Sequence, residues 1–358
     1  MRTTATSTTP TALAHLKVPL GIGTMFWGDT VLDRRISGYV IPKATLAAIC
    51  REAVAHNVTF FDTAEGYGGG TSEERLAAAL RAAGVSDIGA SPYIPATKFL
   101  PTLFRWTESA FLSALDASNR RMGVDCCPLF FIHSPVHPVA IETWVRAAGR
   151  AFKAGKLRAL GLSNFNAEQV GRVCREASRV GVPVTANQLM MNLMVWRSPE
   201  LQRTLAACRE HNLTVIAYAP LGQGLLADAL TPDKCKNIRL SRMTGVTFDD
   251  LTALRQTLSR IAEAHGKTMA QVSTQWVVAK GAVPLVGVRK LDHLHQALGA
   301  TADTGFRLAP HEVDALDACA LGRHTFEKPR WRRSLFVIFI SVLMLAYRAA
   351  QWLPRVAV

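Results

Sequence analysis

Short apolar runs rich in β-branched residues alternate along the chain with longer amphipathic stretches. We predict that the apolar runs are strands, at residues 20–24, 59–63, 94–98, 129–133, 159–164, 184–188, 214–221 and 283–288. The clearest amphipathic stretches, which we predict to be helices, are 45–57, 72–84, 167–181, 201–212 and 248–266. Nearly continuous apolar strands that alternate with helices are typical of a parallel sheet buried on both faces. Eight such units predict an α/β fold of the (β/α)8 TIM-barrel class.

Polar side chains recur at the positions where these predicted strands end. The last residue of each barrel strand and the loop after it line one common mouth, where active sites lie in this fold class. Each of these residues alone could be a helix cap, a solvated charge or a turn residue. Their joint occurrence at one end of the barrel instead indicates a site, and the residues are Gly23, Thr24, Asp62, Lys98, His133, Ser163, Asn164, Gln188 and Tyr218.

The stretch "FFDTAEGYGGG" (60–70) places Tyr67 five residues after Asp62, within reach of Lys98 and His133. A phenol is a weak acid, and a nearby ammonium stabilises its phenolate and lowers its pKa. The buried ammonium of Lys98 would need the Asp62 carboxylate as its partner. An imidazole beside them could orient a substrate carbonyl. These four residues predict a catalytic group that donates a proton to a carbonyl oxygen.

Glycines at 66, 68, 69 and 70 follow the tyrosine and would let the loop turn tightly beside a ligand. We expect Thr71 or Ser72 to cap the helix that begins there. Long loops at 25–44 and 222–247 are expected at the same end of the barrel.

Several motifs in order make the chain, over residues 15–325, resemble the aldo-keto reductase family, in its branch of pyridoxal-reductase-like and chloroplast oxidoreductase-like members. The matching stretches are "LGIGTMFWG" (20–28), "FFDTAEGYGGGTSEERLAAAL" (60–80), "PATKF" (95–99), "FFIHSP" (130–135), "GKLRALGLSNF" (155–165), "ANQLMMNL" (186–193), "VIAYAPLGQGLL" (215–226) and "VPLVGVRK" (283–290). The chain departs from the family pattern at Ala219, Ala297 and His293.

The resemblance implies NADPH-dependent reduction of an aldehyde or ketone, with Tyr67 as general acid, Lys98 and Asp62 as its partners and His133 orienting the carbonyl. It implies that the cofactor lies across the barrel mouth without a Rossmann fold. Ser163, Asn164 and Gln188 would bind the carboxamide, Tyr218 would stack on the nicotinamide, and Arg289 with Lys290 would bind a 2′-phosphate. The remaining implied cofactor contacts are Gly23, Thr24, Asp62, Pro220, Leu221, Gly224 and Gln296.

Aromatic residues near the mouth are candidates for a substrate pocket that accepts a flat or apolar carbonyl compound. The candidates are Trp27, Phe99 and Trp106, with Phe104, Met190 and Trp196 nearby. A buried structural role for each is an open alternative. An alternative for the whole chain is a cofactor-binding regulatory or scaffold subunit at a membrane, with slow or no turnover.

Charge and cysteine content bear on which partners and metal sites we expect. The net charge of +14 over 358 residues is high, but no nucleic-acid-binding motif accompanies it, so we predict no nucleic-acid partner. The seven cysteines form no C-x-x-C pair, which predicts reduced thiols and no metal site. Part of the charge lies after residue 327, at Lys328, Arg330, Arg332, Arg333, Arg348 and Arg355.

The two ends of the chain differ from its middle. Residues 1–14 are expected to be a flexible terminus, with a transit segment as the alternative. A basic linker (326–333) precedes an apolar stretch (334–353) that we predict to be a transmembrane helix bracketed by Trp331 and Trp352. This helix would bind membrane lipid and anchor the catalytic domain on the cytosolic side. The alternatives are an interfacial helix, or a helix packed on the barrel of a soluble cytoplasmic protein.

Overall fold

The computed structural model describes residues 13, 16–136, 139–301, 306–322 and 342. Eight parallel strands pair in sequence order and close into a barrel, with β8 pairing to β1. This confirms the predicted (β/α)8 architecture. The strands are β1 Gly21–Gly23, β2 Phe60–Asp62, β3 Ile94–Phe99, β4 Leu129–Ile132, β5 Leu160–Ser163, β6 Val184–Met190, β7 Thr214–Tyr218 and β8 Val283–Gly287.

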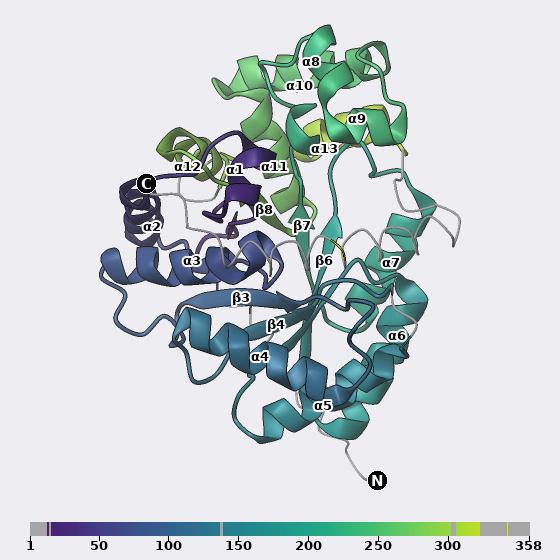
Figure 1. Cartoon of the computed structure of the whole chain (residues 1–358). Coiled ribbons are helices and arrows are strands. Elements are labelled where there is room, and N and C mark those ends of the chain that lie inside the picture. Colours follow the sequence, from purple (N-terminus) through teal and green to yellow (C-terminus); the bar gives the residue numbers. More distant parts are fainter. Residues whose placement is uncertain (1–12, 14–15, 137–138, 302–305, 323–341, 343–358) are drawn as a thin grey trace.

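Helices surround the barrel and run between successive strands (Figure 1). The α-helices are α1 Val31–Ser37, α2 Lys43–Ala55, α3 Thr71–Ala82, α4 Glu108–Met122, α5 Ile141–Lys153, α6 Ala167–Val180, α7 Pro199–Glu210, α8 Pro232–Asn237, α9 Arg239–Thr244, α10 Thr252–His265, α11 Met269–Ala279, α12 Leu291–Leu298 and α13 Pro310–Cys319. The short 3-10 turns are η1 Tyr67–Gly70, η2 Gly222–Gly224 and η3 Asp249–Leu251. Helix α1 lies in the long loop predicted at 25–44, and α8 and α9 lie in the insert around 222–247.

The core has two parts, as a barrel requires. Apolar side chains fill the interior, among them Phe60, Leu129 and Phe131, and Leu13 packs against them. A larger apolar layer lies between the strands and the surrounding helices. The polar side chains Asp62, Lys98, Ser163 and Gln188 lie at or near the carboxyl ends of their strands, where active sites lie in this fold.

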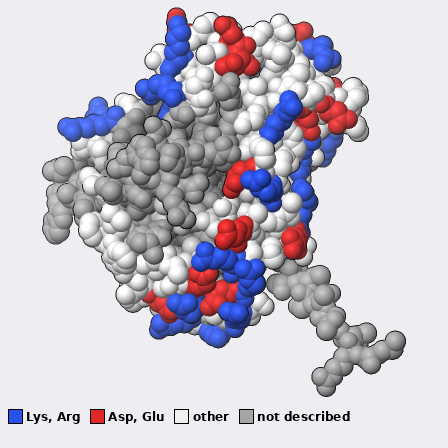
Figure 2. All heavy atoms as spheres, turned by 90° about the vertical axis from the view of Figure 1, so that its right-hand side faces the viewer, with Lys and Arg blue, Asp and Glu red and all other residues white. Residues whose placement is uncertain are grey.

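Acidic and basic side chains are interspersed on the face shown in Figure 2, which includes α5, α6 and α7. Ion pairs at the surface of the described chain include Arg150 with Glu108 at 3.3 Å and Arg172 with Glu142 at 2.9 Å. Exposed pairs of this kind contribute little to stability, typically about 0–1 kcal/mol each.

None of the helices in the described part of the chain combines the length and apolar character that a membrane crossing requires. The basic linker (326–333) and the apolar stretch (334–353) lie outside the described residues, apart from residue 342. Most of the predicted flexible terminus (1–14) also lies outside them. The predictions for these segments stay predictions.

Candidate active site

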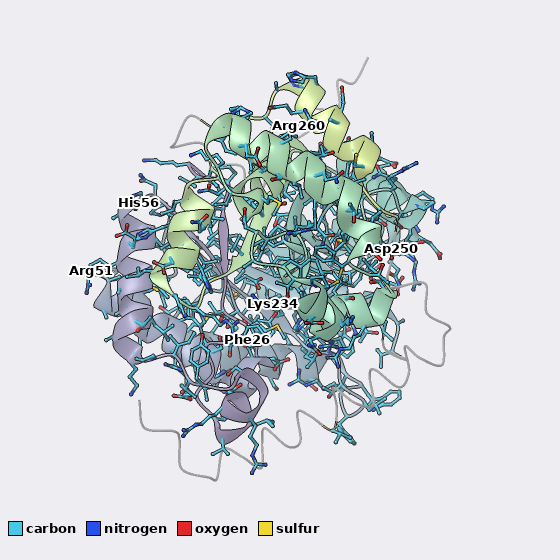
Figure 3. All side chains as sticks on the ribbon, turned by 90° about the horizontal axis from the view of Figure 1, so that it is seen from above. Phe26, Arg51, His56, Lys234, Asp250 and Arg260 are labelled. Atoms are coloured by element: carbon cyan, nitrogen blue, oxygen red, sulfur yellow. The ribbon has the colours of Figure 1, made fainter. Side chains whose placement is uncertain are left out.

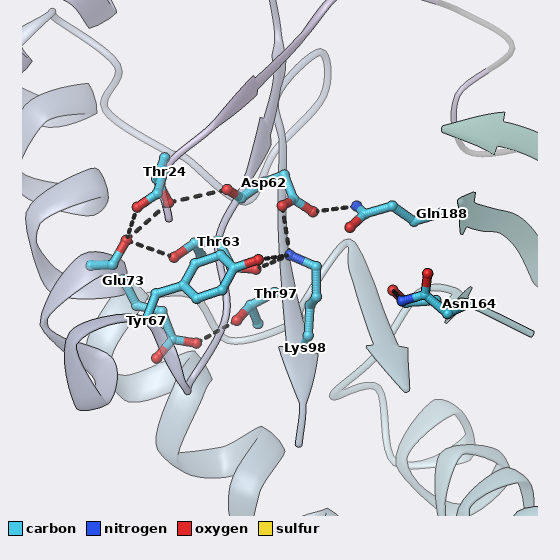
Figure 4. Close-up of polar contacts among 11 residues, drawn as sticks. Thr24, Asp62, Thr63, Tyr67, Glu73, Thr97, Lys98, Asn164 and Gln188 are labelled. Atoms are coloured by element: carbon cyan, nitrogen blue, oxygen red, sulfur yellow. Dashed lines mark hydrogen bonds and ion pairs between the residues drawn. The ribbon is translucent and has the colours of Figure 1, made fainter. Parts of the chain in front are cut away.

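Tyr67, Lys98 and Asp62 are brought together at the carboxyl ends of β2 and β3. The Nζ of Lys98 donates to Asp62 Oδ2 at 2.5 Å, to the Thr63 carbonyl at 2.8 Å and to the Tyr67 hydroxyl at 3.3 Å (Figure 4). The ammonium therefore has three oxygen partners, and one of them is the phenol. This is the arrangement that the sequence predicted for proton delivery.

The loop after Tyr67 needs glycine because its backbone enters the left-handed region. Gly68, Gly69 and Gly70 have φ values of 58°, 62° and 102°. A Cβ on Gly68 would also lie 2.8 Å from the Cα of Gly28. The predicted cap by Thr71 or Ser72 is wrong, since Gly70 is the N-cap residue of α3 and both hydroxyl residues are inside the helix.

His133 follows β4 and faces the phenol. Its ring centroid lies 5.8 Å from that of Tyr67, with the two rings nearly perpendicular. Burial and, to a smaller extent, the charge of Lys98 lower the pKa of His133 to about 3, so the imidazole is neutral at physiological pH. Within the described part of the chain, its buried Nδ1 has no hydrogen-bond partner.

Burial is the largest single influence on the pKa of each of the other three groups, and neighbouring groups oppose it at each one. It raises the pKa of Tyr67 above its ordinary value, although Lys98 acts in the opposite direction. The sequence anticipated a net lowering, and the structure gives the opposite net direction because the phenol is desolvated. Burial alone would lower the pKa of Lys98, but its contacts with Asp62 and Tyr67 together outweigh burial, so the pKa is raised and the ammonium stays charged. Burial raises the pKa of Asp62, while Lys98 and Gln188 oppose that shift.

The predicted nicotinamide contacts lie at the same mouth, but they bond to one another and to Asp62. The Tyr218 hydroxyl donates to Asn164 Oδ1 at 3.0 Å, and Asn164 Nδ2 donates to Ser163 Oγ at 3.1 Å. Gln188 donates from Nε2 to Asp62 Oδ1 at 2.8 Å, across the barrel from β6 to β2. Gln188 is therefore a direct partner of the Asp62–Lys98 pair, which the sequence did not indicate.

Three fully buried hydroxyl residues, Thr24, Thr63 and Ser72, are linked to one another by hydrogen bonds next to Asp62. The sequence did not predict these contacts. Ser72 Oγ lies 2.9 Å from Thr24 Oγ1 and 3.1 Å from Thr63 Oγ1, and donates to the Thr24 carbonyl at 2.9 Å. Thr24 Oγ1 also donates to the Asp62 carbonyl at 3.1 Å. The sequence pattern indicated Ser72 only as a candidate helix cap, so its hydroxyl was not connected to Thr24 and Thr63.

Arg289 follows β8 and is flanked by aromatic rings of the loop after β1. Its guanidinium carbon lies 5.0 Å from the centroid of Phe26 and 5.7 Å from that of Tyr39. Figure 3, which looks onto the molecule from above, shows Phe26 near helix α1. Both rings therefore lie within cation–π distance of the Arg289 guanidinium.

The other predicted cofactor contacts are in two places. Pro220, Leu221 and Gly224 lie in the loop after β7, and Lys290 is the N-cap residue of α12. Gln296 lies exposed on α12, where its Oε1 accepts a hydrogen bond from Thr268 at 3.1 Å.

The aromatic pocket candidates divide into buried and exposed residues. Trp27 is fully buried and donates from Nε1 to the Val288 carbonyl at 2.7 Å. Phe99 is fully buried between Phe111 and Trp144. Both side chains belong to the hydrophobic core and do not lie on a pocket wall. The alternative that each has a buried structural role therefore describes them better. Trp106 is exposed, as a wall residue would be.

The barrel carries a tyrosine, a lysine, an aspartate and a histidine at its mouth. A comparison of the sequence with models of known families agrees with this geometry. The model of the Aldo/keto reductase family matches residues 19–321, so the chain belongs to that family. The predicted family and the predicted class of enzyme are thereby confirmed. Among curated relatives, the chain is 28% identical over 310 residues to the chloroplastic pyridoxal reductase of Arabidopsis thaliana, covering 84% of this chain and 83% of the relative.

Another relative is the aldo-keto reductase yakc of Schizosaccharomyces pombe, whose name specifies NADP(+). It is 29% identical over 272 residues, covering 71% of this chain and 76% of the relative. A solved structure of an aldo/keto reductase from Klebsiella pneumoniae, in complex with NADP and acetate, shares the fold with a TM-score of 0.65 and 22% identity. That alignment covers 87% of this chain and 94% of the other.

Proposed function

We propose that the chain reduces an aldehyde or ketone to the alcohol, with NADPH as the hydride donor. The observation that carries this proposal is the 3.3 Å contact between Lys98 Nζ and the Tyr67 hydroxyl, beside the 2.5 Å contact of Lys98 with Asp62. A buried phenol next to a buried ammonium is suited to giving up a proton when negative charge develops on a nearby oxygen.

The protonation states support this assignment. The raised pKa of Tyr67 keeps its phenol protonated at neutral pH, so it can act as an acid. Once Tyr67 has given its proton to the carbonyl oxygen, Lys98 stabilises the phenolate, and Asp62 keeps Lys98 charged. The neutral imidazole of His133 can donate one hydrogen bond to the same oxygen and fix its position.

NADPH, when bound, would supply a hydride to the carbonyl carbon. Ser163, Asn164 and Gln188 would hold its carboxamide, and Tyr218 would pack against its ring. Arg289 and Lys290 would bind a 2′-phosphate. One observation fits this cofactor: no described residue accepts a hydrogen bond from the Arg289 guanidinium, which lies over the Phe26 ring and could bind an anion. The names of the yeast relative and the Klebsiella complex support NADPH over NADH.

The test is cofactor oxidation by the full chain with aldehydes, ketones and pyridoxal, beside Tyr67→Phe. We expect Tyr67→Phe to lower kcat by about 10²- to 10⁴-fold, because it removes the general acid while leaving the ring. The dissociation constant of NADPH, measured by fluorescence quenching, should stay within about twofold, since Tyr67 is assigned to the carbonyl and not to the cofactor.

Two results would contradict the proposal. Equal turnover by wild type and Tyr67→Phe would remove Tyr67 as the acid. Tight NADPH binding without turnover of any carbonyl would instead favour a cofactor-binding regulatory or scaffold subunit.

We also propose that residues 334–353 attach the enzyme to a membrane, with the barrel on the cytosolic side. The support is the sequence alone: an apolar stretch between two tryptophans, preceded by three arginines.

A further inference from the structure

Glu65 is a buried carboxylate in the loop that carries Tyr67, and it takes no part in the proton-delivery group. Only 5% of the residue is exposed. Its Oε1 accepts a hydrogen bond from the backbone N–H of Leu100 at 2.6 Å. Arg105 donates to both of its oxygens, from Nη2 to Oε2 at 2.9 Å and from Nη1 to Oε1. A buried carboxylate with three donors, two from one guanidinium, is a strong and directional contact.

Arg105 also makes three further contacts, two within its own loop, residues 100–106, and one with Phe99 at the end of β3. Its Nη1 donates to the Leu100 carbonyl at 3.0 Å, and its guanidinium carbon lies 4.9 Å from the centroid of the Phe99 ring. The backbone N–H of Arg105 donates to the Thr102 carbonyl at 3.0 Å. The side chain is itself only 14% exposed. One arginine therefore joins the end of this loop to its beginning and to the Tyr67 loop.

The 100–106 loop directly follows β3, the strand of Lys98, so it lies at the barrel mouth. It carries two large aromatic side chains that are exposed, Phe104 at 67% and Trp106 at 56%. The indole of Trp106 donates from Nε1 to the Leu103 carbonyl at 2.6 Å, which fixes its orientation. Exposing two such rings forgoes hydrophobic stabilisation, and exposed apolar surface beside a site is characteristic of binding.

We propose that Glu65 and Arg105 are positioning residues that hold Phe104 and Trp106 as an aromatic wall at the mouth, and that this wall selects aromatic carbonyl substrates over short aliphatic ones. The inference rests on the proposed reductase function and adds a substrate class to it. Because Glu65 is two residues from Tyr67, the same contact sets the wall relative to the general acid.

The test compares a benzaldehyde-like and a short aliphatic aldehyde in wild type, Arg105→Met, Arg105→Lys and Arg150→Met. We expect Arg105→Met to raise the KM of the aromatic aldehyde by about tenfold, with kcat for the aliphatic aldehyde changed by less than about twofold. Arg105→Lys keeps the charge but loses the bidentate contact, so it should restore the KM only in part. Arg150, which pairs with Glu108 on the exposed surface of α5, is the matched control and should have no effect.

Arg105→Met leaves Glu65 buried without its partner and could prevent folding, so a second variant is needed. The double variant Glu65→Leu with Arg105→Met removes both charges, which is better tolerated, and still releases the loop. Hydrogen–deuterium exchange of a peptide covering 100–106 should be faster in the double variant than in wild type, while exchange in α5 is unchanged.

Unchanged exchange in the loop together with an unchanged aromatic-to-aliphatic preference would overturn the inference. If wild type binds NADPH but reduces neither aldehyde, the proposed reductase function fails and the substrate class fails with it. In that case the exchange rates alone still decide whether Glu65 and Arg105 hold the loop.

Discussion

At the scale of single residues, burial decides the protonation states in the site. Desolvation sets the direction of the pKa shift for Tyr67 and His133, whereas at Lys98 the neighbours Asp62 and Tyr67 outweigh desolvation. Lys98 keeps its charge because Asp62 accompanies it, whereas His133 has no carboxylate partner and is instead next to that ammonium. Desolvation and Lys98 therefore act together on His133 and oppose each other on Tyr67. The site holds one cation, and the two groups that can face a carbonyl oxygen are neutral.

A stability measurement tests the state of His133. The folded protein holds this imidazole neutral down to a pKa of about 3, while the unfolded chain takes up a proton near 6.5. The unfolded state therefore binds more protons between these values, and this residue's contribution is full above 6.5 and lost as the pH falls toward 3. Relative to His133→Gln, the free energy of unfolding of wild type should fall by up to about 1.4 kcal/mol per pH unit in that window.

The matched control is His56→Gln, since His56 lies on the surface and its side chain is 44% exposed. This variant shows how much pH dependence comes from removing a histidine at the surface. A His133→Gln difference no larger than the His56→Gln difference across this window would contradict a neutral buried imidazole. Urea unfolding at several pH values measures both.

At the scale of elements, the first turn of α3 holds the ends of β1 and β2. Ser72 joins Thr24 after β1 to Thr63 after β2, and the Thr63 carbonyl accepts a hydrogen bond from Lys98. Helix α3 thus contacts Thr24 and Thr63, and Thr63 is itself a partner of Lys98. Loss of the Ser72 hydroxyl would leave buried polar groups without one of their partners, which costs about 1–3 kcal/mol.

Ser72→Ala should therefore lower the free energy of unfolding by about 1–3 kcal/mol. It should also lower kcat by about tenfold, because small displacements of catalytic groups are costly. Denaturant unfolding and steady-state kinetics measure the two effects. Ser109→Ala is the control, since Ser109 lies exposed on α4 and pairs with Thr107 at 2.8 Å. A Ser72→Ala variant that behaves like Ser109→Ala would show that these hydroxyl contacts do not position the pair.

At the scale of the whole molecule, barrel closure turns eight separate strand ends into one mouth. Gln188 and Asp62 are 126 positions apart, yet their side chains are 2.8 Å apart. The closed barrel is itself a complete core, because the interior cluster and the layer beneath the helices are both filled. The predicted attachment at residues 334–353 would then change where the enzyme is located without changing the site.

Vesicle sedimentation tests that attachment with the full chain and a chain that ends at residue 327. We expect the full chain alone to pellet with vesicles and to stay in the pellet after alkaline carbonate washing, as a spanning helix would. Release by the wash would indicate an interfacial helix. No sedimentation with either neutral or anionic vesicles would contradict a membrane role and favour a helix packed on the barrel.

Local pattern by itself determined the eight strands, their order around the barrel and the mouth at their carboxyl ends. Apolar runs and polar strand ends are properties of neighbouring residues, so Tyr67, Asp62, Lys98 and His133 could be assigned to one site from sequence. The tertiary structure decided which side chains contact one another. It placed Trp27 and Phe99 in the core, joined Gln188 to Asp62, and paired Glu65 with Arg105. Such contacts depend on how loops pack over the closed barrel and on what that packing excludes from water, and neither is encoded in any short stretch of the chain.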